Sequence, residues 1–300
     1  MSMVDDKTRL AGTNRMELLL FSLGGKEVFG INVFKVREVC ETPEITRAPN
    51  MPKGVEGIIS LRGTIIPVID LATFIGEGFE AASKLIITEF SGHTQAFRVA
   101  EVDRIVRLDW DSVKSPQGLL AQSNHLVTAI TELADGKLVS ILDVEQVLHD
   151  TFGDEPMPAI GPVAPEHART VFFADDSHLA RRKIAQVLER LGVPNQQATN
   201  GREAWNKLAA LAAHAEVDRR PLCESLGVIM VDAEMPEMDG YVLTQHIKAD
   251  PRFARIPVVM HSSLSSVANR KMGQRVGVDA YVAKFDAQHL ASTVAGLLQR

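Results

Sequence analysis

The chain has 300 residues, twice the ~150 residues of an average domain, so its length predicts two domains. Hydrophobic residues make up 45% and charged residues 23%, a composition that suits globular domains with sizeable cores and excludes a disordered or fibrous chain. No stretch approaches the roughly 18 apolar residues of a membrane-spanning helix, and the polar N-terminus lacks the apolar region of a secretory signal. We therefore expect a cytoplasmic protein without direct membrane insertion.

The charges are unevenly distributed. Residues 1–150 contain 15 Lys and Arg against 21 Asp and Glu, whereas residues 151–300 contain 17 of each, which together give the net charge of −6. Neither half has the basic excess that binding to a phosphate backbone usually requires, so nucleic acid is not an expected partner. The two cysteines, Cys40 and Cys223, are too few for a disulfide scaffold or a cysteine-based zinc site, and they suit a reducing cytoplasm.

Short β-rich segments separated by turn residues dominate the first half of the chain. They occupy residues 17–23, 27–33, 57–70, 84–90, 95–108 and 125–133. Such closely spaced strands predict an all-β domain over residues 16–150, as one barrel or a pair, after an N-terminal tail at residues 1–15. Helical periodicity is limited to residues 144–150 and a weaker segment at 33–38.

A proline-rich segment separates the two halves. Residues 151–168 contain Pro156, Pro158, Pro162 and Pro165. Because proline fixes φ and restricts the residue before it, this segment cannot continue a helix or a central strand. We expect a semi-extended linker here.

The periodicity changes in residues 169–300, where strands and helices alternate. Strands are predicted at residues 171–174, 228–231, 257–261 and 280–283, and helices at 177–191, 201–213, 241–249, 267–276 and 288–299. Short apolar strands that alternate with helices indicate parallel βαβ units, covered on both faces. The second half therefore predicts an α/β doubly wound domain with a five-stranded parallel sheet. The long segment at 214–227 has no explanation in the sequence.

Polar residues follow several of these strands at their carboxyl ends, where such sheets bind ligands. They are Asp175 and Asp176, Asp232, Ser262 and Lys284. Three carboxylates at one edge would repel one another unless a cation neutralises them, and hard oxygen ligands without His or Cys favour Mg²⁺. A carboxylate beside Mg²⁺ can attack phosphorus, while a lysine ammonium neutralises the phosphoryl oxygens. The pattern predicts a site for phosphoryl transfer to an aspartate.

The motifs VFFADDS (171–177), VDAEMPEMDG (231–240), PVVMHSS (257–263) and AYVAKF (280–285) resemble those of response-regulator receiver domains, which have a flavodoxin-like fold. The resemblance implies that Asp232 accepts the phosphoryl group. It also implies that Asp175, Asp176, Asp232 and the backbone carbonyl of Glu234 bind Mg²⁺.

Three further roles follow from the same resemblance. Ser262 would be the hydroxyl that responds to the phosphoryl group, Lys284 the lysine that contacts it, and Tyr281 the aromatic switch residue. Ser262 replaces a commoner threonine and keeps the hydroxyl. Phe285 replaces the proline that usually follows the lysine, which puts the usual cis peptide there in doubt. His261 is not expected to have a role.

The first half has no catalytic signature, so we expect a binding module there. Its segments FSLGGKEVFGINVFKVREV (21–39) and VEGIISLRGTIIPVIDL (55–71) resemble the CheW coupling domain of bacterial chemotaxis, which folds as two small SH3-like barrels. Such domains connect the chemotaxis histidine kinase to the cytoplasmic tips of chemoreceptors. The resemblance implies a partner-binding role for Arg62, with Glu38 as its charged companion.

A CheW-like domain followed by a receiver is the arrangement of the CheV family, which the whole chain resembles. The resemblance implies a phosphorylation-dependent coupling protein of the membrane-associated receptor array that modulates signalling towards adaptation. It also implies no enzyme activity beyond slow self-dephosphorylation. A constitutive scaffold with a degenerate receiver and a phosphate sink for the kinase stay open as alternatives. A phosphohydrolase is disfavoured because such enzymes place an acid/base aspartate two residues after the nucleophile, where this chain has Glu234.

Overall fold

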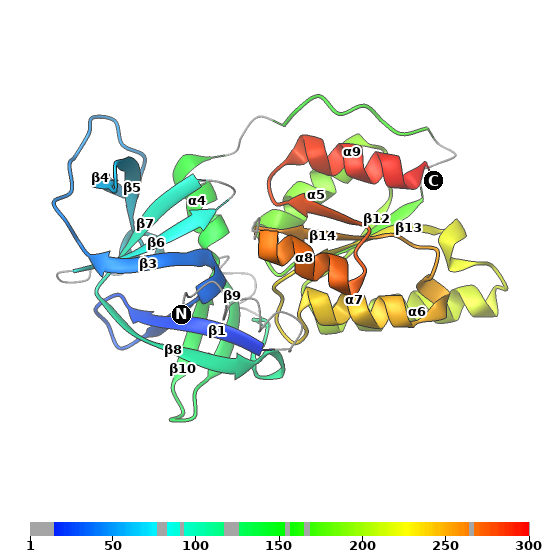
Figure 1. The fold of residues 1–300 in the computed structure, drawn as a ribbon, viewed down its shortest axis with the longest axis horizontal. Helices are drawn as coiled ribbons and strands as arrows, with labels where there is room; N and C mark the ends of the chain where they lie inside the picture. Colours follow the sequence, from blue (N-terminus) through cyan, green and yellow to red (C-terminus); the bar gives the residue numbers. More distant parts are fainter. Residues whose placement is uncertain are drawn as a thin grey trace. The chain divides into compact units, whose positions relative to one another are not determined.

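The computed structural model describes residues 15–76, 83–90, 93–116, 126–153, 157–164, 169–263 and 267–299 (Figure 1). Two compact units divide the chain, one formed by Met16–Glu155 and the other containing Pro156–Arg300. Within the described residues, no helix combines the length and the apolar character needed to cross a membrane.

The first unit contains two five-stranded sheets, each with its own apolar core. One sheet has the order β8-β1-β2-β10-β9, and its core includes Leu18, Leu20 and Val139. Strand β1 is antiparallel to β2, and β9 is antiparallel to β10, whereas β2 and β10 are parallel. The strand bounds are β1 Arg15–Ser22, β2 Val28–Asn32, β8 Glu101–Asp109, β9 Val127–Glu132 and β10 Leu138–Leu142. A short 3-10 helix, η2 Trp110–Ser112, follows β8.

The second sheet has the order β3-β6-β7-β5-β4, with β5 and β7 parallel. Its core includes Ile59, Val68 and Leu85. Its strands are β3 Val36–Glu41, β4 Val55–Leu61, β5 Thr64–Asp70, β6 Lys84–Phe90 and β7 His93–Val99. The described residues of this unit also form the helices α2 Ala72–Ile75 and α4 Val144–Phe152. The prediction of a β-rich first domain is confirmed.

The hairpin between β4 and β5 places Arg62 at the tip of a two-residue turn. Leu61 pairs with Thr64, and Arg62 and Gly63 have φ values of 51° and 84°. Two successive positive φ angles are the pattern of the type I′ turn, whose twist matches that of the flanking strands. Gly63 adopts this backbone without strain.

The helix that the sequence suggested at residues 33–38 is wrong for most of its length. Only η1, a 3-10 helix at Val33–Lys35, forms there, and the Asn32 side chain accepts a hydrogen bond of 3.0 Å from the Phe34 backbone N–H. Val36 begins strand β3, which pairs with β6. The β-branched valines of this segment favour the sheet, and the sheet contact overrides the weak helical periodicity.

The second unit is built on a parallel sheet of order β12-β11-β13-β14-β15. The strands are β11 Thr170–Ala174, β12 Asn195–Ala198, β13 Leu226–Asp232, β14 Val258–Ser262 and β15 Ala280–Ala283. The helices are α5 His178–Arg190, α6 Gly201–Val217, α7 Gly240–Ala249, α8 Val267–Val276 and α9 Ala287–Leu298. The predicted flavodoxin-like doubly wound fold is confirmed.

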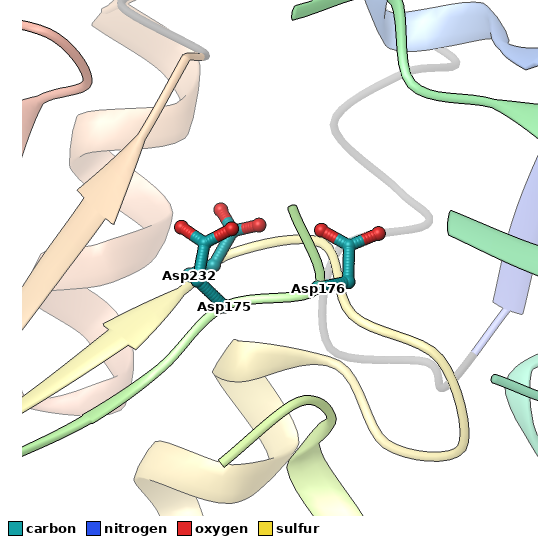
Figure 2. A group of neighbouring side chains, drawn as sticks. All are labelled: Asp175, Asp176 and Asp232. Carbon is teal, nitrogen blue, oxygen red and sulfur yellow. The ribbon is translucent and has the colours of Figure 1, made fainter. Parts of the chain in front are cut away.

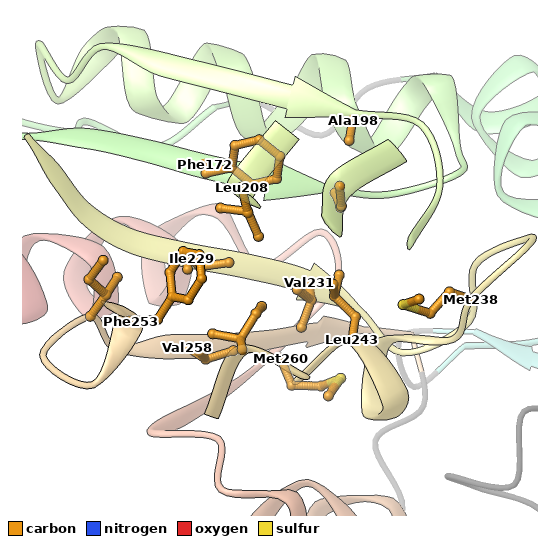
Figure 3. Packing of buried hydrophobic residues seen from close by; sticks show 14 of the residues in the cluster. Phe172, Ala198, Leu208, Ile229, Val231, Met238, Leu243, Phe253, Val258 and Met260 are labelled. Atoms are coloured by element: carbon orange, nitrogen blue, oxygen red, sulfur yellow. The ribbon is translucent and has the colours of Figure 1, made fainter. Parts of the chain in front are cut away.

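Alternate side chains of the central strand β13 face two different cores. Ile229 and Val231 belong to a cluster with residues of α6 and α7, part of which is shown in Figure 3. Val228 and Met230 belong to a second cluster with residues of α5 and α9. Because both faces of the sheet are covered, every residue of β13 is buried.

Two features of this unit have weak sequence signals. Strand β12 reads Asn-Gln-Gln-Ala and exposes its first three residues, so the polar edge strand lacks the apolar run by which the other strands are recognised. The unexplained segment 214–227 extends α6 to Val217 and then forms η4, a 3-10 helix at Leu222–Glu224. Leu222 is buried in the cluster beneath α6 and α7, which anchors the segment to the core.

The proline-rich segment partly packs onto the second unit. Thr151 and Phe152 of the predicted linker lie in α4. Met157, Ile160 and Val163 pack against the apolar cluster of α5 and α9. The Val163 backbone N–H donates a hydrogen bond of 2.9 Å to the Leu191 carbonyl, and the Arg190 side chain donates one of 3.1 Å to the Pro158 carbonyl.

We expect Ile160→Asp to lower the thermal unfolding midpoint of the second unit, by the equivalent of about 1–2 kcal/mol, because it places a charge against an apolar cluster. Ala159→Asp is the matched control, since it adds the same charge at the exposed neighbouring position. Calorimetry of the full chain measures both variants. Equal midpoints for the two would show that the segment is not docked.

Candidate functional site

Three carboxylates meet at the carboxyl-terminal edge of the parallel sheet. Asp175 and Asp176 directly follow β11, and Asp232 is the last residue of the neighbouring β13. Each offers an oxygen within 4.8 Å of the others, as Figure 2 illustrates. Asp175 and Asp232 are buried and Asp176 is half-buried. The strand order thus brings together residues that the sequence separates by more than fifty positions.

The ammonium of Lys284 lies between the two buried carboxylates. Lys284 follows β15 and is itself buried, and its Nζ lies 3.1 Å from Oδ1 of Asp175 and 3.0 Å from Oδ2 of Asp232. One ammonium among three carboxylates leaves two negative charges, which is the charge that a divalent cation balances. The donor set is entirely carboxylate oxygen, which suits Mg²⁺.

The electrostatics of Asp175 reflect two opposing effects. Burial alone raises the pKa of its carboxyl, but the Lys284 ammonium and His261 lower it, and the resulting pKa is about 2. Asp175 is therefore ionised at neutral pH. The Ser177 backbone N–H also donates a hydrogen bond of 3.0 Å to its Oδ1.

Two residues beside the aspartates had no expected role in the sequence. His261 Nδ1 lies 3.8 Å from Oδ2 of Asp175, since β14 places it next to the cluster. The Arg181 guanidinium donates hydrogen bonds of 2.8 and 2.9 Å to the backbone carbonyls of Asp175 and Asp176. Arg181 lies one helical turn into α5, and this spacing after the Asp-Asp pair was the only available signal.

Ser262 and Tyr281 form a hydroxyl pair at the same edge of the sheet. Ser262 ends β14 and is fully buried. Burial raises the pKa of Tyr281 to about 12, and a hydrogen bond with Ser262 opposes this rise. The Ser262 carbonyl accepts a hydrogen bond of 3.1 Å from the Lys284 backbone N–H, so the two strand ends are connected.

The loop after Asp232 is held close to the phosphoacceptor candidate by Asp239 and Gly240. Asp239 caps α7, since its Oδ1 accepts a hydrogen bond of 2.7 Å from the Val242 backbone N–H. A Cβ on Gly240 would lie 1.9 Å from the Asp232 carbonyl oxygen, so only glycine permits this approach. Glu234 is half-buried in the same loop.

Phe285 has a backbone conformation that proline could not adopt. Its φ is 67°, whereas the proline ring holds φ near −65°. No cis peptide bond occurs in the described parts of the chain. The Lys183 Nζ lies 4.8 Å from the centre of the Phe285 ring, a cation–π distance. The aromatic side chain therefore has a contact of its own at this position.

In the first unit, the structure pairs Arg62 with Glu38. The Arg62 guanidinium at the hairpin tip lies 2.6 Å from a carboxylate oxygen of Glu38 on β3. The Arg62 side chain is 78% exposed, and ion pairs this exposed add little to stability. Stability is thus a weak reason for having an arginine at this tip.

Comparisons with known proteins agree with this arrangement. The CheW-like domain family matches residues 17–152, and the response regulator receiver domain family matches residues 171–295. The chain is 32% identical to the chemotaxis protein CheV3 of Helicobacter pylori over 303 aligned residues, which cover 96% of each protein. It is 29% identical to CheV1 of the same organism, covering 99% of this chain and 97% of CheV1.

A single-domain relative matches the first half alone. The chemotaxis protein CheW of Klebsiella aerogenes is 28% identical, and the alignment covers 53% of this chain and 96% of that protein. The match therefore supports the first domain independently of the receiver. With a relative above 30% identity along nearly its whole length, the chain belongs to the CheV family of chemotaxis coupling proteins, in which a receiver domain follows a CheW-like domain.

Proposed function

We propose that the receiver accepts a phosphoryl group on Asp232 and thereby controls how the CheW-like domain couples chemoreceptors to the chemotaxis histidine kinase. The observation that supports this most is the position of Lys284, 3.0 Å from Asp232 and 3.1 Å from Asp175, in a buried cluster of carboxylates. A buried ammonium beside the nucleophile is placed to neutralise charge on a transferred phosphoryl group.

In this proposal Asp175, Asp176, Asp232 and the Glu234 backbone carbonyl hold Mg²⁺, which neutralises phosphoryl oxygens when bound. An oxygen of Asp232 attacks the phosphorus of a phosphohistidine on the kinase. The P–N bond breaks, and the departing imidazole takes up a proton. Lys284 then pairs with a phosphoryl oxygen, and the Ser262 hydroxyl donates a hydrogen bond to another.

The switch depends on the change in Ser262's partner. Without the phosphoryl group, Ser262 is hydrogen-bonded to Tyr281. A new dianion beside Asp232 is a stronger acceptor than a neutral phenol, so Ser262 turns towards it. Such a change alters coupling only if the two receiver states contact the array differently. Water slowly removes the phosphoryl group, and no external substrate is turned over.

The CheW-like domain supplies the contacts with the kinase and with the cytoplasmic tips of the receptors. Arg62 presents an exposed guanidinium at a rigid turn, and Glu38 orients it through the ion pair. The protein then acts in the cytoplasm at membrane-associated receptor arrays. A phosphate sink needs the same receiver pocket, and only the response of the kinase to phosphorylation separates it from a switch.

We expect Asp232→Asn to abolish labelling by the ³²P-phosphorylated cognate chemotaxis kinase with Mg²⁺, because the amide is a poor nucleophile. The matched control is Asp218→Asn, which removes an exposed aspartate at the end of α6. The control should accept label as the wild type does. If the wild type accepts no label, the constitutive scaffold replaces this proposal; equal labelling of wild type and Asp232→Asn would place the acceptor elsewhere.

Lys284→Met should reverse the pH dependence of the receiver's stability in the metal-free protein. In the wild type, the low pKa of Asp175 adds stability above the unfolded value near 3.9, and this stability is lost as pH falls towards 2. Without the ammonium, burial outweighs the remaining effect of His261 and raises the carboxyl pKa of Asp175, so stability is lost as pH rises.

Calorimetry in chelator between pH 2 and 8 measures this difference. At pH 7 the variant should lose about 3 kcal/mol, the size expected when one partner of a buried ion pair is removed, and Mg²⁺ should stabilise it more than the wild type. A variant whose stability falls with decreasing pH, as in the wild type, would contradict the assigned electrostatics.

Arg62→Ala should weaken co-sedimentation of the full chain with receptor arrays that contain the kinase, by roughly tenfold or more. Arg107→Ala is the matched control, since Arg107 is also exposed and its guanidinium also lies 2.6 Å from a glutamate, Glu17. The exchange of Arg62 and Glu38 for each other tests the mechanism. Recovery of binding in the variant with Arg62 and Glu38 exchanged would show that the ion pair only shapes the turn. Equal losses of binding in Arg62→Ala and Arg107→Ala would contradict a specific role for Arg62.

A further inference from the structure

The chain contains two tyrosines: Tyr241 belongs to the apolar cluster of α6 and α7, and the partly buried Tyr281 packs against that cluster. Tyr281 lies on β15 and its neighbour in register on β14 is Met260. Tyr241 is the second residue of α7, directly after Gly240, which packs against the Asp232 backbone. Both side chains therefore contact the same apolar cluster.

The Tyr241 hydroxyl is buried and has no hydrogen-bond partner among the described residues. The whole residue is only 3% exposed, so bulk water does not compensate for the missing bond. Burial is the main cause that raises the pKa of Tyr241, followed by the charges of Tyr281, Glu234, Asp239 and Asp232. The Tyr241 hydroxyl therefore lies within electrostatic reach of Tyr281 and of the loop that follows the phosphoacceptor. A buried, unpaired hydroxyl is costly, which makes it unusual in a native core.

In the proposed phosphorylated state, the Tyr281 hydroxyl loses its hydrogen-bond partner. It is hydrogen-bonded to Ser262 before phosphorylation. When Ser262 turns to the phosphoryl group, the Tyr281 hydroxyl loses this bond while its side chain stays in the cluster. The buried Tyr241 hydroxyl and the released hydroxyl of the half-buried Tyr281 would then both lie at one apolar cluster, and pairing them gives each a hydrogen bond.

We propose that the Tyr241 hydroxyl is the partner that Tyr281 takes when Ser262 turns to the phosphoryl group. Tyr241 is thus a positioning residue that favours the phosphorylated conformation, and this inference rests on the proposed function. In the unphosphorylated protein its hydroxyl is unpaired, which raises the free energy of that state relative to the switched one. The Tyr281 hydroxyl thus has two alternative hydrogen-bond partners, Ser262 before phosphorylation and Tyr241 after it.

The presence of only two tyrosines makes the exchange directly observable. The full chain is labelled with 3-fluorotyrosine, and its two ¹⁹F signals are assigned with Tyr241→Phe and Tyr281→Phe. Spectra are recorded with Mg²⁺ before and after addition of beryllofluoride, a phosphoryl mimic. We expect both signals to shift. In Tyr241→Phe, the Tyr281 signal should move to a different position in the beryllofluoride state than it does in the wild type.

A thermodynamic cycle gives a second readout. Tyr241→Phe should bind beryllofluoride roughly three- to tenfold more weakly, the effect of one lost hydrogen bond between neutral groups. Without beryllofluoride its thermal stability should be equal to or above that of the wild type, because a buried unpaired hydroxyl is removed. The double variant with Tyr281→Phe should bind no more weakly than the weaker single variant.

The outcomes separate the two ideas. If the wild type binds beryllofluoride and Asp232→Asn does not, while the Tyr241 signal is unshifted and the two substitutions are additive, this inference is overturned and the proposed function stands. If the wild type binds no beryllofluoride, both are overturned. A loss of stability in Tyr241→Phe without beryllofluoride would also overturn the inference, since it would mean that the hydroxyl is already paired.

Discussion

The ammonium of Lys284 between two buried carboxylates is the interaction on which the receiver site depends. Asp175 and Asp232 are taken out of water at adjacent strand ends, and without a cation their repulsion would oppose the packing of β11 against β13. Lys284 supplies that cation from β15, across 109 and 52 positions of the chain. The apolar clusters on both faces of the sheet keep the three strand ends in register, so that a single charged side chain can serve both aspartates.

The charges of this carboxylate cluster stabilise the site and also bear on the proposed phosphorylation switch. Three carboxylates and one ammonium leave the site negatively charged, which favours Mg²⁺ and makes a nearby dianion tolerable only with that cation present. Ser262 is hydrogen-bonded to Tyr281, and in the proposed switch it exchanges this partner for a phosphoryl group on Asp232. The close approach of Gly240 to the Asp232 backbone fixes the start of α7 beside this strand end.

The CheW-like domain differs from the receiver in where its candidate functional charge lies. Its two sheets have separate apolar cores, and its candidate contact is a charge at the surface. The type I′ turn holds Arg62 at the hairpin tip while leaving most of its side chain in water. The proline-rich segment belongs partly to the receiver's own packing, because three apolar side chains in it reach the α5 and α9 cluster.

The sequence by itself determined the fold class of each half and the membership of the receiver cluster. Helical and strand periods are local properties, and parallel strands necessarily bring their carboxyl ends to one edge, so Asp175, Asp232 and Lys284 could be grouped without coordinates. Tertiary structure decided what has no local signal. Polar β12 is a strand because β11 pairs with it, and residues 33–38 mostly join a sheet because β6 is available. The partners of Arg181 and His261, the docking of Ile160 and the unpaired Tyr241 hydroxyl all depend on contacts between segments distant in sequence, which periodicity and turn residues do not encode.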